Sequence, residues 1–89
     1  MKAIITVLGS DRPGIIAEVS AKLFEHNINI LEISQTIMDS CFTMVMQVEL
    51  SGMNLSFKAM QEELNSTAEK SHIEIRMQRY EIFEAMHRV

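Results

Sequence analysis

The stretch that decides the fold is K-A-I-I-T-V-L-G-S-D-R-P-G-I-I-A-E-V, which runs from Lys2 to Val19. Its first part, residues 2–8, is β-branched and apolar on both alternating faces, which is typical of a central strand covered on two sides. Turn residues then interrupt the pattern, and Pro13 is tolerated in the first turn of a helix. The segment therefore predicts a strand, a short loop and a helix.

Beyond this stretch, the spacing of the apolar residues changes in turn between that of a helix and that of a strand. We expect the first helix to bury the stripe of Ile16, Val19 and Leu23, and to close near His26 with Asn27 in a left-handed conformation. The rest of the chain predicts a strand over 28–38, a tight turn at 39–40, a strand over 42–50, a helix with Phe57, Met60, Leu64 and Ala68 on one stripe, a strand over 73–78, and a short terminal helix.

This order predicts an α+β fold, a ferredoxin-like βαββαβ sandwich with a four-stranded antiparallel sheet, two helices on one face and a short C-terminal helix. We expect one domain over residues 1–80 and a helical tail over 81–89. The other face of the sheet would then be bare, although Val45 and one alternate set from the first strand must point toward it. That set is either Ile4 and Leu8 or Ala3, Ile5 and Val7. An exposed apolar patch of this kind marks an interface, so a partner is expected.

Composition excludes several classes of protein. The chain has 89 residues, with 8 Lys and Arg against 12 Asp and Glu, and this net charge of -4 argues against nucleic-acid binding. No stretch approaches the ~18 apolar residues of a membrane span. A single cysteine, Cys41, allows no internal disulfide. These counts predict a soluble cytoplasmic protein without nucleic-acid or membrane partners.

Neither a metal site nor a catalytic site can be assembled from the residue spacing. His26, His72 and His87 are not at ligand spacing, and Cys41 stands alone, so neither a metal nor a cofactor is expected. Arg12 lies where an acylphosphatase-type enzyme would hold phosphate, but the glycine-rich cradle is missing. No nucleophile–base pair or carboxylate pair is evident. We therefore predict no catalytic residues and a protein that is not an enzyme.

The loop over residues 10–15, at the junction of the first strand and helix, is the remaining candidate site. Free backbone N–H groups and the positive end of a helix favour a carboxylate, and Gly14 lets a ligand approach the backbone closely. Asp11 could meet an ammonium group. These features suit the zwitterionic head of an amino acid. The alternative is a plain capped turn in which Pro13 and Gly14 serve only geometry.

The sequence also resembles a known family. Residues 5–17, I-T-V-L-G-S-D-R-P-G-I-I-A, resemble the opening of an ACT domain, and residues 27–30, N-I-N-I, are similar to the second recurring segment of that family. The resemblance covers roughly Met1 to Arg79. More narrowly, the lone domain with its ending over 83–89 resembles small bacterial stand-alone ACT proteins, which are related to the ACT domains of the glycine-cleavage repressor.

The resemblance implies a regulatory module that binds amino acids or similar small ligands, usually between two domains. Its contact residues, carried over by position, would be Asp11, Arg12, Pro13, Gly14, Ile15, Asn27, Ile28 and Asn29. We therefore expect a ligand-binding regulatory homodimer. Two alternatives stay open: a ligand-independent module that docks on an enzyme or regulator through a sheet edge or a methionine-bearing surface, and a small phosphoryl-transfer or hydrolytic enzyme that depends on Arg12.

Overall fold

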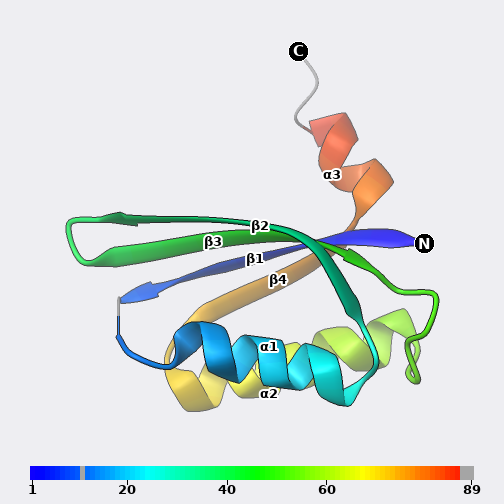
Figure 1. Cartoon of the computed structure of the whole chain (residues 1–89), viewed down its shortest axis with the longest axis horizontal. Helices are drawn as coiled ribbons and strands as arrows, with labels where there is room; N and C mark the ends of the chain where they lie inside the picture. Colours follow the sequence, from blue (N-terminus) through cyan, green and yellow to red (C-terminus); the bar gives the residue numbers. More distant parts are fainter. Residues whose placement is uncertain (11, 87–89) are drawn as a thin grey trace.

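The structure, a computed structural model, describes residues 1–10 and 12–86 and has the predicted element order (Figure 1). Its elements are β1 (Lys2–Ser10), α1 (Ile15–Glu25), β2 (Asn29–Met38), β3 (Cys41–Glu49), α2 (Phe57–Ser71), β4 (Glu74–Arg79) and α3 (Tyr80–Met86). The strands form one sheet in the order β2-β3-β1-β4, and all neighbours are antiparallel. The ferredoxin-like α+β prediction is confirmed.

The strand β1 lies in the middle of the sheet and supplies the centre of the core. Ile5 lies opposite Met46 on β3 and Met77 on β4, and directly opposite residues share a face of an antiparallel pair. All three side chains are buried beneath α1 and α2. Methionine adapts to irregular gaps, so these residues fill the space between sheet and helices. The core continues through Ala3, Val7, Met44, Val48, Met60, Leu64, Ala68 and Ile75.

The buried stripe of α1 differs by one position from the prediction at its start. The helix buries Ile15, Val19 and Leu23, whereas Ile16 is 38% exposed. The helix begins at Ile15, and a spacing of four residues carries the same face through Val19 to Leu23. Phe24 lies off this face and is 86% exposed.

The second face of the sheet is only partly bare, which corrects the sequence prediction. The β1 register resolves the choice left by the sequence, because Ile4 lies opposite Gln47 and Leu8 opposite Thr43, on the face away from the helices. Ile4 is nevertheless only 5% exposed. The chain turns after β4, and α3 stands on this face, on the opposite side of the sheet from α1 and α2 (Figure 1). Sequence spacing predicted the terminal helix but carried no signal for the face it covers.

The hairpin between β2 and β3 turns through Asp39 and Ser40, which have φ values of 49° and 69°. Both values lie in the left-handed region, as a two-residue hairpin turn that matches strand twist requires. Asn27 also has a positive φ of 58° and follows α1 as predicted. The hairpin turn sets the register at its own end, where Met38 pairs with Cys41.

Replacing Ser40 with glycine should stabilise the protein, because a left-handed residue other than glycine is strained. We expect Ser40→Gly to raise the free energy of unfolding by about 0.5–1 kcal/mol, the strain relieved less the extra entropy of the unfolded chain. Chemical denaturation measures the change. The matched control is Ser34→Gly in the extended strand β2, which should lower stability. Equal losses in both variants would contradict the turn geometry.

Candidate functional site

The loop after β1 delivers the N-terminus of α1 to the surface without a side-chain cap. Gly14 is the residue before the helix and has a φ of 92°, where an L side chain would be strained. In the described part of the chain, no side chain accepts a hydrogen bond from the first turn. Among the described residues the N–H groups of Ile15 and Ile16 have no side-chain acceptor, and together with the helix dipole they favour an anion.

A hollow of about 500 Å³ lies between this helix start and the β2–β3 hairpin, and we call it the α1 hollow. Its lining consists of Arg12, Pro13, Gly14, Ile15, Ile16, Ala17, Gln35, Ile37 and Phe42. Most of these contribute apolar surface, while Gln35 offers an amide, and the volume lies in the range of small-molecule sites. The hollow can therefore hold a small anion with an apolar body.

The side chain of Arg12 is held by neighbouring polar groups. Its guanidinium lies 3.2 Å from each carboxylate oxygen of Glu18 and donates to the carbonyl oxygen of Ser71 at 3.3 Å. The hydroxyl of Ser71 also donates to Glu18. These hydrogen bonds, the one from Arg12 first, lower the pKa of Glu18 below its ordinary value of 4.5. This cluster connects the loop to both helices. Because the guanidinium of Arg12 is paired with Glu18, the backbone N–H groups supply much of the positive electrostatic potential in the hollow.

The second predicted segment lies at the other end of α1. Asn27 donates from its side-chain amide to the carbonyl oxygen of Gly52 at 2.9 Å, and Ile28 is buried. The 11 residues of α1 separate this segment from Gly14 by about 16 Å along the helix axis. One subunit does not bring the two predicted segments together. Asp11 lies outside the described residues.

Sequence reasoning missed the hairpin side of the α1 hollow. Gln35, Ile37 and Phe42 line it, yet they are more than 20 positions from Gly14 along the chain. Ile37 pairs directly with Phe42 across the hairpin. The alternating pattern of these strands could have indicated that pair, but its proximity to α1 follows from sheet packing alone.

Outside the α1 hollow, His26 has a structural role. Its Nδ1 lies 3.0 Å from Oδ1 of Asn54 and its Nε2 lies 3.2 Å from Oε1 of Glu63, which links the end of α1 to α2. His72 is exposed, and His87 lies outside the described residues. In residues 1–10 and 12–86, no group of three His, Cys, Asp or Glu side chains could hold a metal ion. The helices described there are too short or too polar to cross a membrane.

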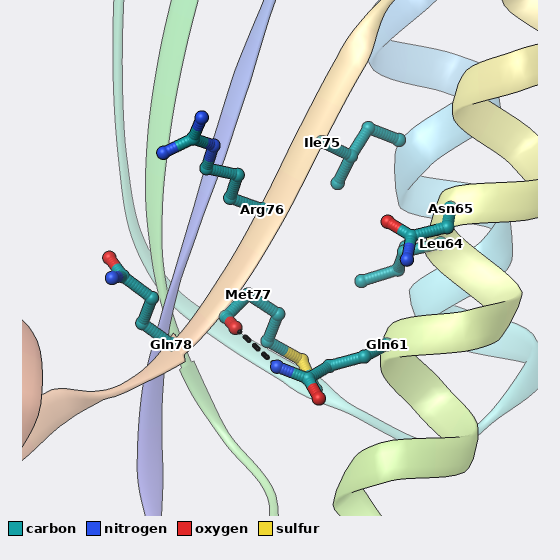
Figure 2. Close-up of a pocket in the computed structure, with 7 residues that line it drawn as sticks. All are labelled: Gln61, Leu64, Asn65, Ile75, Arg76, Met77 and Gln78. Carbon is teal, nitrogen blue, oxygen red and sulfur yellow. Dashed lines mark hydrogen bonds between the residues drawn. The ribbon is translucent and has the colours of Figure 1, made fainter.

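A second hollow, of about 290 Å³, lies between α2 and the edge strand β4 (Figure 2). The amide of Gln61 crosses it and donates to the carbonyl oxygen of Met77 at 2.9 Å. An unpaired strand edge invites pairing with other chains, and a side chain bonded to it opposes that pairing. Gln61 therefore protects the β4 edge of the sheet against pairing with another strand.

The family model described as the ACT domain matches residues 2–78. The chain belongs to the ACT-domain family. A UPF0237 protein of Listeria innocua is 47% identical over 89 residues, and one of Clostridium acetobutylicum is 51% identical over 89 residues; both alignments span the whole of each chain. ACT domains are regulatory modules, and these relatives indicate no catalytic family.

Solved structures agree with this assignment. An ACT domain protein from Streptococcus pneumoniae is 42% identical, with a TM-score of 0.83 and 98% of each chain covered. The regulatory subunit of aspartate kinase from Thermus thermophilus is 25% identical, with a TM-score of 0.67 over 86% of this chain and 50% of that one. A glycine cleavage system transcriptional repressor, at 24% identity and a TM-score of 0.71 over 86% of this chain and 44% of that one, shares the fold. The predicted family is thus confirmed.

The pKa of Glu18 should depend on Arg12. We expect Arg12→Ala to raise the Glu18 pKa toward 4.5, because the largest cause of its depression is removed. Carboxyl NMR titration measures the change. The pKa of Glu18 is lower in the folded state than in the unfolded state. Glu18 therefore stabilises the fold at pH values above its unfolded-state pKa, and this stabilisation is lost as the pH falls through its folded-state pKa.

The pKa of Glu63 provides the control for this titration, because His26 and Lys22 lower it. It should stay unchanged in the Arg12→Ala variant. A Glu18 pKa that does not respond to the substitution would show that the contact with Arg12 is absent in solution.

Proposed function

We propose that this ACT domain is a cytoplasmic regulatory module that binds an amino acid in the α1 hollow and acts as a homodimer. The observation that carries the proposal is the uncapped first turn of α1, which borders a hollow with largely apolar walls. A carboxylate would accept hydrogen bonds from the N–H groups after Gly14, and an apolar side chain would lie against Ile37 and Phe42. A regulatory subunit of an amino-acid kinase among the similar structures supports this ligand class.

A proposed contact for the ammonium group lies beside the carboxylate site. The side-chain carbonyl of Gln35 lines the same hollow and can accept from an ammonium group. From its position in the sequence, Asp11 is proposed as a second partner for the ammonium group. Arg12 is engaged with Glu18, so we assign it a positioning role for the loop.

The homodimer is proposed to form along the edge strand β2. Four apolar residues of this strand, Leu31, Ile33, Ile37 and Met38, are between 45% and 68% exposed, whereas the other edge of the sheet is blunted by Gln61. A two-fold pairing of β2 with its copy would bury these side chains in a self-complementary contact. It would also cover the open side of the α1 hollow, because Ile37 belongs to both surfaces.

This dimer would unite the two segments that one subunit keeps apart. In an antiparallel pairing of two β2 strands, the start of one strand lies beside the end of the other. The partner's Asn29 would then lie near Ile37, at the rim of the α1 hollow, and the partner's Asn27 would follow close by. Each site would consist of the loop of one subunit and the segment over residues 27–29 of the other.

Ligand binding should raise the melting temperature. An amino acid present at about 100 times its Kd adds about 2.7 kcal/mol of stability, which corresponds to a shift of about 10 °C or more. We expect at least one amino acid of a complete panel to produce such a shift in differential scanning fluorimetry. If no amino acid raises the melting temperature, the proposed ligand class is wrong.

A matched pair of alanines locates the site. Ala17 lines the α1 hollow, whereas Ala21 is exposed one turn further along the same helix and outside the hollow. Leucine preserves helix propensity at both positions. Ala17→Leu should fill the hollow and abolish the ligand-induced shift, while Ala21→Leu should retain it. Loss of the shift in both variants, or in neither, would contradict the site.

The dimer contact can be tested by charge. Ile37→Glu should produce a monomer in light scattering coupled to size exclusion, because it places carboxylates in the proposed contact. The comparison variant is Leu8→Glu, which lies on the face of the sheet opposite α1 and should remain dimeric. A monomeric Leu8 variant together with a dimeric Ile37 variant would place the contact on that face.

The second candidate, ligand-independent docking on another protein, has one specific observation in its favour. Phe24 extends from α1 with 86% of its surface exposed. An exposed aromatic side chain is an anchor suited to protein interfaces. Binding to an enzyme or regulator that is lost in Phe24→Ser and is indifferent to amino acids would favour this candidate over the ligand-binding one.

A further inference from the structure

A separate groove lies on the far face of the sheet, between α3 and the strands β2 and β3. We call it the α3 groove; its volume is about 460 Å³, and its floor consists of Ile4 and Val45. Tyr80 and Phe83 of α3 form one wall, and Gln47 lies between Ile4 and Glu32 on the same face of the sheet. Figure 1 shows α3 on the side of the sheet away from α1 and α2, so this groove is distinct from the α1 hollow.

The apolar floor is local, because polar side chains lie beside it on the same face of the sheet. Ile4 is 5% exposed and Val45 is half-buried, and the two lie on the neighbouring strands β1 and β3. On this face Ile4 lies opposite Gln47 and Gln78, and Val45 lies opposite Thr6 and Ser34. The aromatic wall and apolar floor therefore bound one local site, whose volume suits a small molecule.

The charged side chain among the residues that line the groove is the carboxylate of Glu32. Glu32 of β2 forms no salt bridge among the described residues. The Tyr80 hydroxyl makes a hydrogen bond with Glu84, and this bond, with the charges of Glu84 and Glu32, raises the pKa of Tyr80. Arg76, a cation on this face, lies opposite Thr6 and forms no salt bridge in the described part of the chain.

We propose that the α3 groove binds a small organic cation, a primary ammonium group carried on an apolar or aromatic body. The ammonium would pair with the carboxylate of Glu32, which lines the groove. The apolar body would lie on Ile4 and Val45 against the ring of Tyr80, and aromatic faces attract cations in addition. The α3 groove would bind a cation, whereas the α1 hollow favours an anion. The proposal for the groove does not depend on the function proposed for the hollow.

Three matched probes test the charge preference: benzylamine, benzyl alcohol and benzoate. Each is titrated into the full-length ¹⁵N-labelled protein and followed by amide chemical shifts. We expect benzylamine to shift the amides around residues 4, 32–34, 45–47 and 80–83. Benzyl alcohol should bind at least about fivefold more weakly, because it lacks the charge that pairs with Glu32. Benzoate should not shift these amides.

A pair of isosteric variants tests the role of Glu32. Glu32→Gln should weaken benzylamine binding by about fivefold, whereas Glu74→Gln, opposite Leu8 at the other end of the same face, should not change it. The variants carry the same change in net charge, so a general electrostatic effect would weaken both alike.

Several results would overturn the proposal. These are an absence of shifts with benzylamine, equal binding of benzyl alcohol, equal weakening by both Gln variants, or shifts confined to residues 14–17 of the α1 hollow. Concentration-dependent shifts, without a probe, of the amides of residues 4, 45 and 80–83, which lie outside the proposed β2 contact, would show that a second copy of the chain covers this face. That result would also overturn a cation site, and it is separate from the amino-acid test on the α1 hollow.

Discussion

The central position of β1 is the constraint on which the rest of the structure depends. Hydrogen bonding to β3 on one side and β4 on the other places Ile5 between Met46 and Met77, beneath both helices. Because β1 cannot shift by one residue without moving its buried side chains to the other face, its register is fixed. The end of β1 then positions the loop before α1, and with it the uncapped helix start beside the β2–β3 hairpin.

The two edges and two faces of the sheet have different chemical character. At the β4 edge, Gln61 occupies a carbonyl group and opposes pairing with another chain. At the β2 edge, apolar side chains remain exposed over most of the strand. The face under α1 and α2 is the core, while on the other face Ile4 and Val45 lie beside α3 among largely polar neighbours. These asymmetries distinguish an edge suited to self-association from surfaces suited to small ligands.

The polar contacts of the chain organise the ends of the helices and leave the interior apolar. Arg12, Glu18 and Ser71 join the start of α1 to the end of α2, and His26 joins the end of α1 to Glu63 on α2. No polar or charged side chain is buried in the described part of the chain. Binding chemistry is therefore located at helix ends and sheet margins, where side chains and backbone groups meet solvent.

The sequence by itself determined the order of elements, the stripe of α2, the left-handed Asn27 and the loop around Gly14, because each depends on residues close together along the chain. Tertiary structure alone decided that Gln35, Ile37 and Phe42 face this loop, and that α3 covers Ile4. Those contacts join residues that are far apart in sequence. The periodicity of apolar residues indicates which side chains share a face of an element, but it does not indicate which other element packs against that face. The same limit explains why residues 12–15 and 27–29 read as one site in the sequence, although α1 holds them at its opposite ends.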